Sequence, residues 1–139
     1  MATYNKFNSF VEAVMEKVHN LGADSMKVML TNVVPLATNS IKTDITEIAP
    51  GNGYTAGGTA TTITSSLQTA GTYKLTITDV TFTAAVGSMA AFRYAVLYND
   101  TALNKELIGF FDYGAALTLL VGESLLVDFD AAAGVITLV

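Results

Sequence analysis

Residues 89–114, MAAFRYAVLYNDTALNKELIGFFDYG, decide the fold of this chain. Large side chains recur at every second position in the first half of this stretch: Phe92, Tyr94, Val96 and Tyr98. This alternation predicts a strand with four large side chains on one face. The turn formers at 99–101 predict a reversal, and residues 107–113 predict the return strand. Because an isolated hairpin is only marginally stable in water, a second sheet must cover it.

Alternating apolar and polar residues continue on both sides of this hairpin. Turn residues divide them into further predicted strands at 24–31, 59–67, 73–78, 81–83, 117–121, 124–130 and 135–139. About eight short strands with frequent turn signals are typical of an antiparallel β-sandwich, either jelly-roll-like or immunoglobulin-like. We therefore expect a mainly β fold, a jelly-roll-like sandwich with one N-terminal helix.

The helix is predicted over residues 5–21. Apolar residues there follow helical spacing: Phe7, Phe10, Val11, Val14, Val18 and Leu21. This stripe is typical of an amphipathic helix that packs on another surface. Ser9 and Glu12 fit a capping box, and Gly22 is well placed to end the helix.

Residues 32–58 are predicted to form a long loop, with one helical turn near 43–48. Pro35, Pro50 and the glycine-rich run 51–58 disfavour regular structure. Loops of this length are usually functional or held by a partner, and glycine can conform to a partner's backbone. The candidate partner interface comprises nine residues: Tyr4, Phe7, Gly51, Asn52, Gly53, Tyr54, Thr55, Gly57 and Gly58. Tyr54 is the aromatic side chain in this loop that could stack on a sugar ring or on a neighbouring subunit, and folding onto its own sandwich is the favoured alternative.

Composition narrows the functional classes. A chain of 139 residues predicts one domain, residues 1–139. Only 14% of residues are charged, which indicates a weakly polar surface, and coverage of part of it by other subunits is one interpretation beside a surface made wet by Thr, Ser, Asn and Gly. The net charge of −5 argues against nucleic acid or an anionic membrane as partner. The absence of Cys excludes disulfides and Cys-ligated metals. The N-terminus lacks the apolar core of a signal peptide and no apolar run is long enough to span a bilayer, so we expect a soluble protein made in the cytoplasm.

The residues that could take part in nucleotide binding, catalysis or metal binding are more simply explained by structural roles. Residues 51–56 match G-x-G-x-x-A, but no buried strand precedes them and no helix follows, which favours a loop. His19, the only histidine, is expected to lie partly exposed near the helix end. Asp112, Asp128 and Asp130 could bind Ca²⁺, but such acids more often form a solvated strand face. We therefore predict no catalytic residue, no cofactor and no metal.

Seven segments resemble one family of viral structural proteins. They are residues 4–7, 18–24, 27–32, 51–58, 92–101, 108–114 and 127–129. Together they are similar to the capsid decoration, or cement, proteins of tailed bacteriophages. The resemblance implies a β-sandwich or jelly-roll that forms a dimer or trimer and binds the outside of the major capsid protein shell. Members often carry Trp where this chain has Phe82, Phe110 and Phe111.

The resemblance implies a virion protein without catalytic residues, and loop 32–58 is the first choice for its capsid-facing element. The N-terminal helix is the second choice. A tail or head-fibre protein remains an alternative, as does a carbohydrate-binding module that uses Tyr4, Tyr54 or Asp112. A small hydrolase is a third class, for which the sequence offers no clear nucleophile and base.

Overall fold

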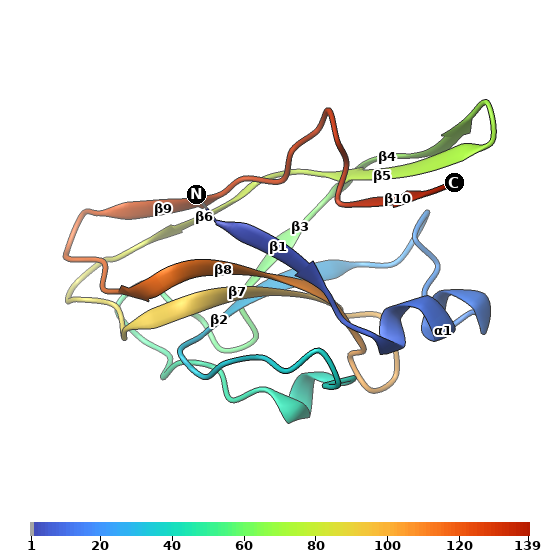
Figure 1. Ribbon diagram of the computed structural model, residues 1–139. Helices are drawn as coiled ribbons and strands as arrows, with labels where there is room; N and C mark the ends of the chain where they lie inside the picture. The colour runs from blue at the N-terminus through green and yellow to red at the C-terminus, as the bar shows by residue number, and fades with distance from the viewer. Residues whose placement is uncertain (1) are drawn as a thin grey trace.

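The computed structural model describes residues 2–139, and its strands pair antiparallel throughout. A five-stranded sheet has the order β1 (Thr3–Lys6), β8 (Leu107–Leu117), β7 (Phe92–Asn99), β2 (Met26–Thr31) and β3 (Thr59–Thr61). The smaller sheets are β10 (Ile136–Leu138), β5 (Thr72–Ile77) and β4 (Ile63–Thr69), and β6 (Val80–Thr83) with β9 (Ser124–Val127). Figure 1 shows both smaller sheets on one side of the large sheet. The predicted mainly β, antiparallel fold is confirmed; the sheets are not closed, and the jelly-roll-like sandwich stays a prediction.

The central hairpin and most of the predicted strands are present. The predicted strand 59–67 divides at Thr62, because β3 pairs with β2 whereas β4 pairs with β5. The strand predicted at 117–121 is wrong, since only Leu117 is in a strand and a turn follows. The strand predicted at 124–130 ends at Val127.

The helix predicted at 5–21 is much shorter, because α1 spans Ser9–Met15. Residues 5–6 instead pair with β8 as part of β1. Lys17 adopts a left-handed φ of 66°, and the Val18 N–H donates to the Ala13 carbonyl at 2.8 Å, which ends the helix before Gly22. The capping box is not formed, since Asn8 is the N-cap residue and makes no side-chain cap bond.

Both faces of the large sheet are buried, which the hairpin pattern did not predict. The register of β7 shifts between Phe92 and Tyr94, so Phe92 joins Ala95 and Leu97 on the face toward the smaller sheets. A second core cluster covers the opposite face: Phe7, Met29, Ile45, Tyr94, Val96, Tyr98, Leu107 and Phe110. Alternation of side chains therefore lets β7 contribute to both clusters, and the bulge moves Phe92 to the face of Ala95 and Leu97.

Loop 32–58 forms the cover over this second face. It contains the short 3₁₀ helix η1 (Lys42–Asp44) close to the helical turn that was predicted, and Ile45 enters the cluster. Backbone bonds fasten the loop, including those from Leu107 N–H to the Ser40 carbonyl and from Asn8 N–H to the Ala37 carbonyl, both at 2.9 Å. The loop is therefore an integral layer of the fold.

The same loop completes the edge of β2. Because β3 pairs only with the first half of β2, the backbone of Leu30 needs other partners. The Ile48 N–H donates to the Leu30 carbonyl at 3.0 Å, and the Leu30 N–H donates to the Tyr54 hydroxyl at 3.2 Å. That hydroxyl donates to Glu47 Oε2 at 2.7 Å, which also accepts the Gly57 N–H at 2.8 Å. A side chain thus takes the place of a strand partner.

These bonds also control the charge of Glu47. Burial tends to raise the pKa of its carboxyl, but hydrogen bonds from Tyr54, Gly57 and Lys42 outweigh burial and lower the pKa below its ordinary value. Burial and the nearby carboxylate raise the pKa of Tyr54. Glu47 therefore remains an ionised acceptor and Tyr54 a protonated donor at neutral pH.

The first prediction concerns the Tyr54 hydroxyl. Tyr54→Phe leaves the buried Leu30 N–H without an acceptor and should lower the free energy of unfolding by about 1–3 kcal/mol. Urea denaturation measures this change. The control is Tyr73→Phe, which removes a hydroxyl bonded to Ser66 at a half-buried site and should cost less. Equal effects of the two variants would contradict the role given to Tyr54.

The second prediction concerns Gly58, which has a φ of +79°. A Cβ there would lie 1.8 Å from the Val28 carbonyl oxygen, whereas a Cβ at Gly114, with a φ of +83°, meets nothing within 4 Å. Gly114→Ala should cost about 1–2 kcal/mol of stability for the backbone alone, and Gly58→Ala about 2–5 kcal/mol. Thermal unfolding of both variants measures the two losses of stability, and their difference is the cost of the steric clash at Gly58. Similar losses in the two variants would contradict the close approach of Gly58 to the Val28 carbonyl.

Candidate partner interface

Three turns meet at one end of the fold, at the left of Figure 1. We call this surface the apex and define it as residues 51–53, 84–88 and 118–123. The Ala85 N–H donates to the Asn52 carbonyl at 3.0 Å, and Asn52 Nδ2 donates to the Ser88 carbonyl at 2.7 Å. The Gly122 N–H donates to the Ala84 carbonyl at 2.9 Å. These bonds hold turns that are distant in sequence as one surface.

The apex is apolar and poor in charge. Val86, Leu120 and Val121 have exposed fractions of 97%, 56% and 62%. Glu123 is the only charged residue of the apex, and its Oε2 accepts the Leu120 N–H at 2.8 Å. Exposed apolar side chains grouped in this way are typical of a surface that binds another protein.

The backbone of the apex is strained at its most exposed residue. Val86 has a φ of 72°, a left-handed conformation that β-branched residues rarely adopt and that costs about 1–3 kcal/mol. The turn beside it is tightly seated, since a Cβ on Gly53 would lie 2.1 Å from the Thr83 carbonyl oxygen. Strained backbone that the surrounding structure maintains is concentrated at binding and catalytic sites. Strain, exposure and apolar character therefore coincide at Val86.

The nine residues predicted for the interface divide between surface and core. Gly51, Asn52 and Gly53 lie exposed in the apex, and Thr55 is exposed nearby. Of the two alternatives for Tyr54, packing against its own chain is the one observed: only 3% of it is accessible, because its hydroxyl completes β2 and its ring lies 6.0 Å from that of Phe82.

Phe7, Gly57, Gly58 and Tyr4 also have structural roles. Phe7 is completely buried, with its ring centroid 5.1 Å from that of Phe110, so it cannot contact a partner. Gly57 and Gly58 are half-buried, and the Gly57 carbonyl accepts the Tyr98 hydroxyl at 2.6 Å. Gly58 allows a close approach to the backbone of Val28, so at least this glycine has a role within the chain. Tyr4 is half-buried in β1 against Phe111.

The expected position of His19 is also wrong. His19 lies beyond α1 and is buried. The side-chain amide nitrogen of Asn99, Nδ2, lies 3.0 Å from His19 Nδ1 and donates a second hydrogen bond of 2.6 Å to Asp24 Oδ2. Burial lowers the pKa of His19, against the opposing effect of the Glu106 and Asp24 carboxylates. Neutral His19 therefore belongs to a buried polar network at the end of β7, where Asn99 Oδ1 also accepts N–H groups of the predicted turn.

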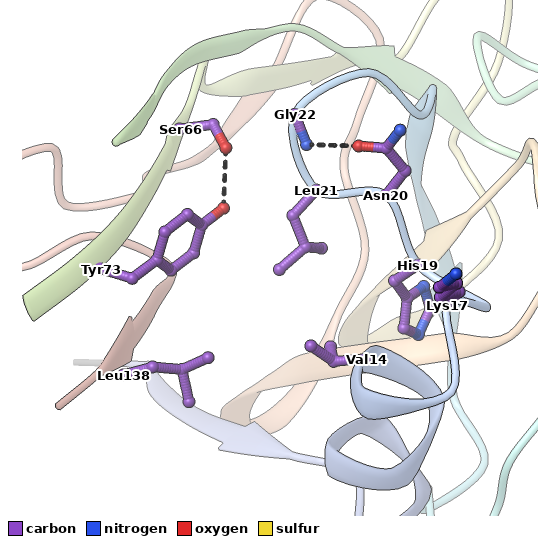
Figure 2. A pocket seen from close by; sticks show the side chains of 9 residues that line it. All are labelled: Val14, Lys17, His19, Asn20, Leu21, Gly22, Ser66, Tyr73 and Leu138. Carbon is purple, nitrogen blue, oxygen red and sulfur yellow. Dashed lines mark hydrogen bonds between the residues drawn. The ribbon is translucent and has the colours of Figure 1, made fainter. Parts of the chain in front are cut away.

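Next to His19 lies a cleft of about 490 Å³ between the segment after α1 and strands β4, β5 and β10 (Figure 2). It is lined by Val14, Lys17, His19, Asn20, Leu21, Gly22, Ser66, Tyr73 and Leu138. Ser66 and Tyr73 share a hydrogen bond of 2.9 Å, and His19 is bonded to Asn99. The Ser66 hydroxyl is bonded to Tyr73 and the Nδ1 of His19 to Asn99, whereas the buried Nε2 of His19 has no hydrogen-bond partner, so no hydroxyl of the cleft is hydrogen-bonded to the imidazole.

The three acids considered for Ca²⁺ are not gathered. Asp112 is bound by Arg93 through contacts of 2.8 and 3.0 Å, and hydrogen bonds from Arg93 and from the Gly114 N–H lower its pKa. Asp130 accepts the Ala132 N–H at 2.8 Å. Within residues 2–139, no three His, Cys, Asp or Glu side chains are arranged to hold a metal ion.

The structure also shows where the G-x-G-x-x-A segment and the carbohydrate-binding candidates lie. The G-x-G-x-x-A segment is followed by β3, so it lacks the strand–turn–helix arrangement of a dinucleotide site. Of the residues considered for a carbohydrate site, Tyr54 is buried and Asp112 is paired with Arg93. No helix in the described part of the chain is long and apolar enough to span a bilayer.

The apex had no continuous signal in the sequence. Its residues come from three separated turns, and 118–121 matched a strand pattern. The local sequence offered only a glycine directly after a valine in each of the segments 84–88 and 118–123. Comparison with known proteins adds no precedent, since the chain matches no family model, no curated protein and no solved structure.

The third prediction concerns pH. The pKa of His19 is lower in the folded protein than its ordinary value of about 6.5 in the unfolded chain. As the pH falls, His19 is therefore protonated in the unfolded chain before it is protonated in the folded protein, and this favours unfolding. The contribution of neutral His19 to stability is therefore complete above that pH and decreases as the pH falls toward the folded pKa. The slope is at most about 1.4 kcal/mol per pH unit. Urea denaturation between pH 7.5 and about 5.5 measures it.

The control is His19→Gln, which can still accept a hydrogen bond from Asn99 but does not titrate. This variant should have a flatter stability profile over the same pH range, where the carboxylates titrate little. Identical profiles for the two proteins would exclude His19 as the source of the pH dependence.

Proposed function

We propose that this chain is a structural virion protein that binds the outside of an assembled tailed-phage capsid. The observation that carries the proposal is the apolar apex, whose three turns are joined by hydrogen bonds, with its strained, exposed Val86. The resemblance to capsid decoration proteins supplies the partner, the major capsid protein. The fold that accompanies this role is a jelly-roll-like sandwich in a homo-oligomer, either a dimer or a trimer.

The apex suits a cement protein for energetic reasons. A protein that binds the assembled lattice better than loose subunits adds its binding free energy to the assembled state. The apex is held by backbone hydrogen bonds before binding, so little conformational entropy is lost on contact. A homo-oligomer that presents several apices gains from the high effective concentration of linked sites. Neighbouring capsid subunits are cemented in this way without chemical catalysis.

The capsid-facing element in this proposal differs from the one expected from the sequence. Only the 51–53 part of loop 32–58 belongs to the apex, and it acts together with two turns that lie far along the chain. The remaining loop covers the second core cluster, although Val33, Val34 and Leu36 are exposed on it. The protein would be made in the host cytoplasm and reside on the capsid exterior. A tail or head-fibre protein is the alternative assignment, with the apex binding a different virion protein.

The fourth prediction tests the apex. Val86→Asp places a charge in the apolar surface, and Asp tolerates a left-handed backbone better than Val, so the fold should be retained. We expect binding to undecorated phage heads to fall at least tenfold. Co-sedimentation with heads of the phage that encodes the chain measures this, with thermal unfolding as the test of folding.

The matched control is Leu103→Asp. Leu103 is 92% exposed and lies between β7 and β8, at the end of this hairpin opposite the apex. This variant should bind heads as the natural protein does. If both variants bind equally well, the apex is not the capsid-binding surface. If the natural protein sediments with purified tails and not with heads, the head assignment is wrong.

A further inference from the structure

Strand β1 forms an open edge of the five-stranded sheet, on the side where Figure 1 shows no neighbouring strand of that sheet. Its register with β8 is regular, and the Phe7 N–H donates to the Ile108 carbonyl at 3.2 Å. Since antiparallel pairs alternate, the N–H and C=O groups of Asn5 also face β8. Those of Tyr4 and Lys6 point away from the sheet. Within the described residues, these backbone groups therefore have no strand partner, as at any sheet edge, and the side chains of Tyr4 and Lys6 line a groove with residues of α1 and β10.

The charges along this edge are of opposite sign at its two ends. Lys6 is exposed at the end of β1, on the same side of the strand as Tyr4. Asp128 and Asp130 are exposed and line a groove together with Tyr4. The same two carboxylates lie next to Ala2 at the start of β1. A basic residue thus lies at one end of the edge and an acidic pair near the other.

We propose that β1 pairs antiparallel with β1 of a second copy of this chain, about a two-fold axis at Asn5. In this register Tyr4 of one copy exchanges backbone hydrogen bonds with Lys6 of the other. Lys6 then lies beside the Tyr4 of the second copy and reaches its Asp128 and Asp130. Two-fold symmetry repeats this contact, so the surface is complementary to itself.

The inference rests on the homo-oligomer of the proposed function and assigns its contact. A second copy is favoured as the occupant because the edge supplies both the basic and the acidic partner. Antiparallel pairing directs the two apices to opposite ends of the dimer. One dimer could then reach two neighbouring capsid subunits, which is the geometry that cementing requires.

The test uses the purified full chain without capsids, so it is independent of the capsid-binding proposal. Sedimentation velocity should show a concentration-dependent dimer. Lys6→Glu should weaken the dimer at least roughly tenfold, because like charges then meet at both symmetry-related contacts. Combining Lys6→Glu with Asp128→Lys and Asp130→Lys should restore it. The control Lys17→Glu makes the same charge change at an exposed residue away from β1 and should have little effect.

Hydrogen exchange locates the contact directly. The amides of Tyr4 and Lys6 should gain protection when the protein concentration is raised, and they should lose it in Lys6→Glu. A chain that stays monomeric at high concentration would overturn the proposal. A dimer whose β1 amides exchange as in the monomer would also overturn it, whether or not the protein binds capsids.

Discussion

The structure depends on how the backbone of β2 is hydrogen-bonded beyond Val28, where β3 no longer pairs with it. Leu30 lies in the half of β2 that the short β3 does not reach, and a buried backbone group without a partner is costly. Loop 32–58 solves this with the Ile48 N–H and the Tyr54 hydroxyl. Glu47 then fixes the hydroxyl. These few bonds attach a loop of irregular structure to the sheet and determine where the glycine-rich segment can lie.

Two consequences of this attachment shape the molecule. The loop covers the face of the sheet that carries Tyr94, Val96 and Tyr98, so a sheet that would otherwise expose aromatic rings is buried on both sides. The loop also places residues 51–53 beside the turns at 84–88 and 118–123. These two turns lie after β6 and after β8, next to the start of β7. The apex is therefore a product of the same packing that stabilises the fold, and this explains why its backbone can sustain strain at Val86.

The proposed surfaces lie in different parts of the fold and need no chemical group in common. The apex provides apolar area with little charge, whereas the β1 edge provides backbone hydrogen-bonding groups and opposite charges. Binding through the apex depends on shape and apolar contact, and self-association through β1 depends on register and electrostatic complementarity. A chain with 14% charged residues can use both, because few charges have to be desolvated when either surface is covered.

The sequence by itself determined the class of fold, the central hairpin and most strands, because alternation of side chains depends only on the period of a strand. It also located the turn at Asn99 and the long loop, through residues with local backbone preferences. Only the tertiary structure decided the rest. The length of α1, the bulge that redirects Phe92, the burial of Tyr54 and His19, and the assembly of the apex all arise from contacts between distant segments. Local preference cannot encode these contacts, because each depends on which groups the completed core leaves without partners or without space.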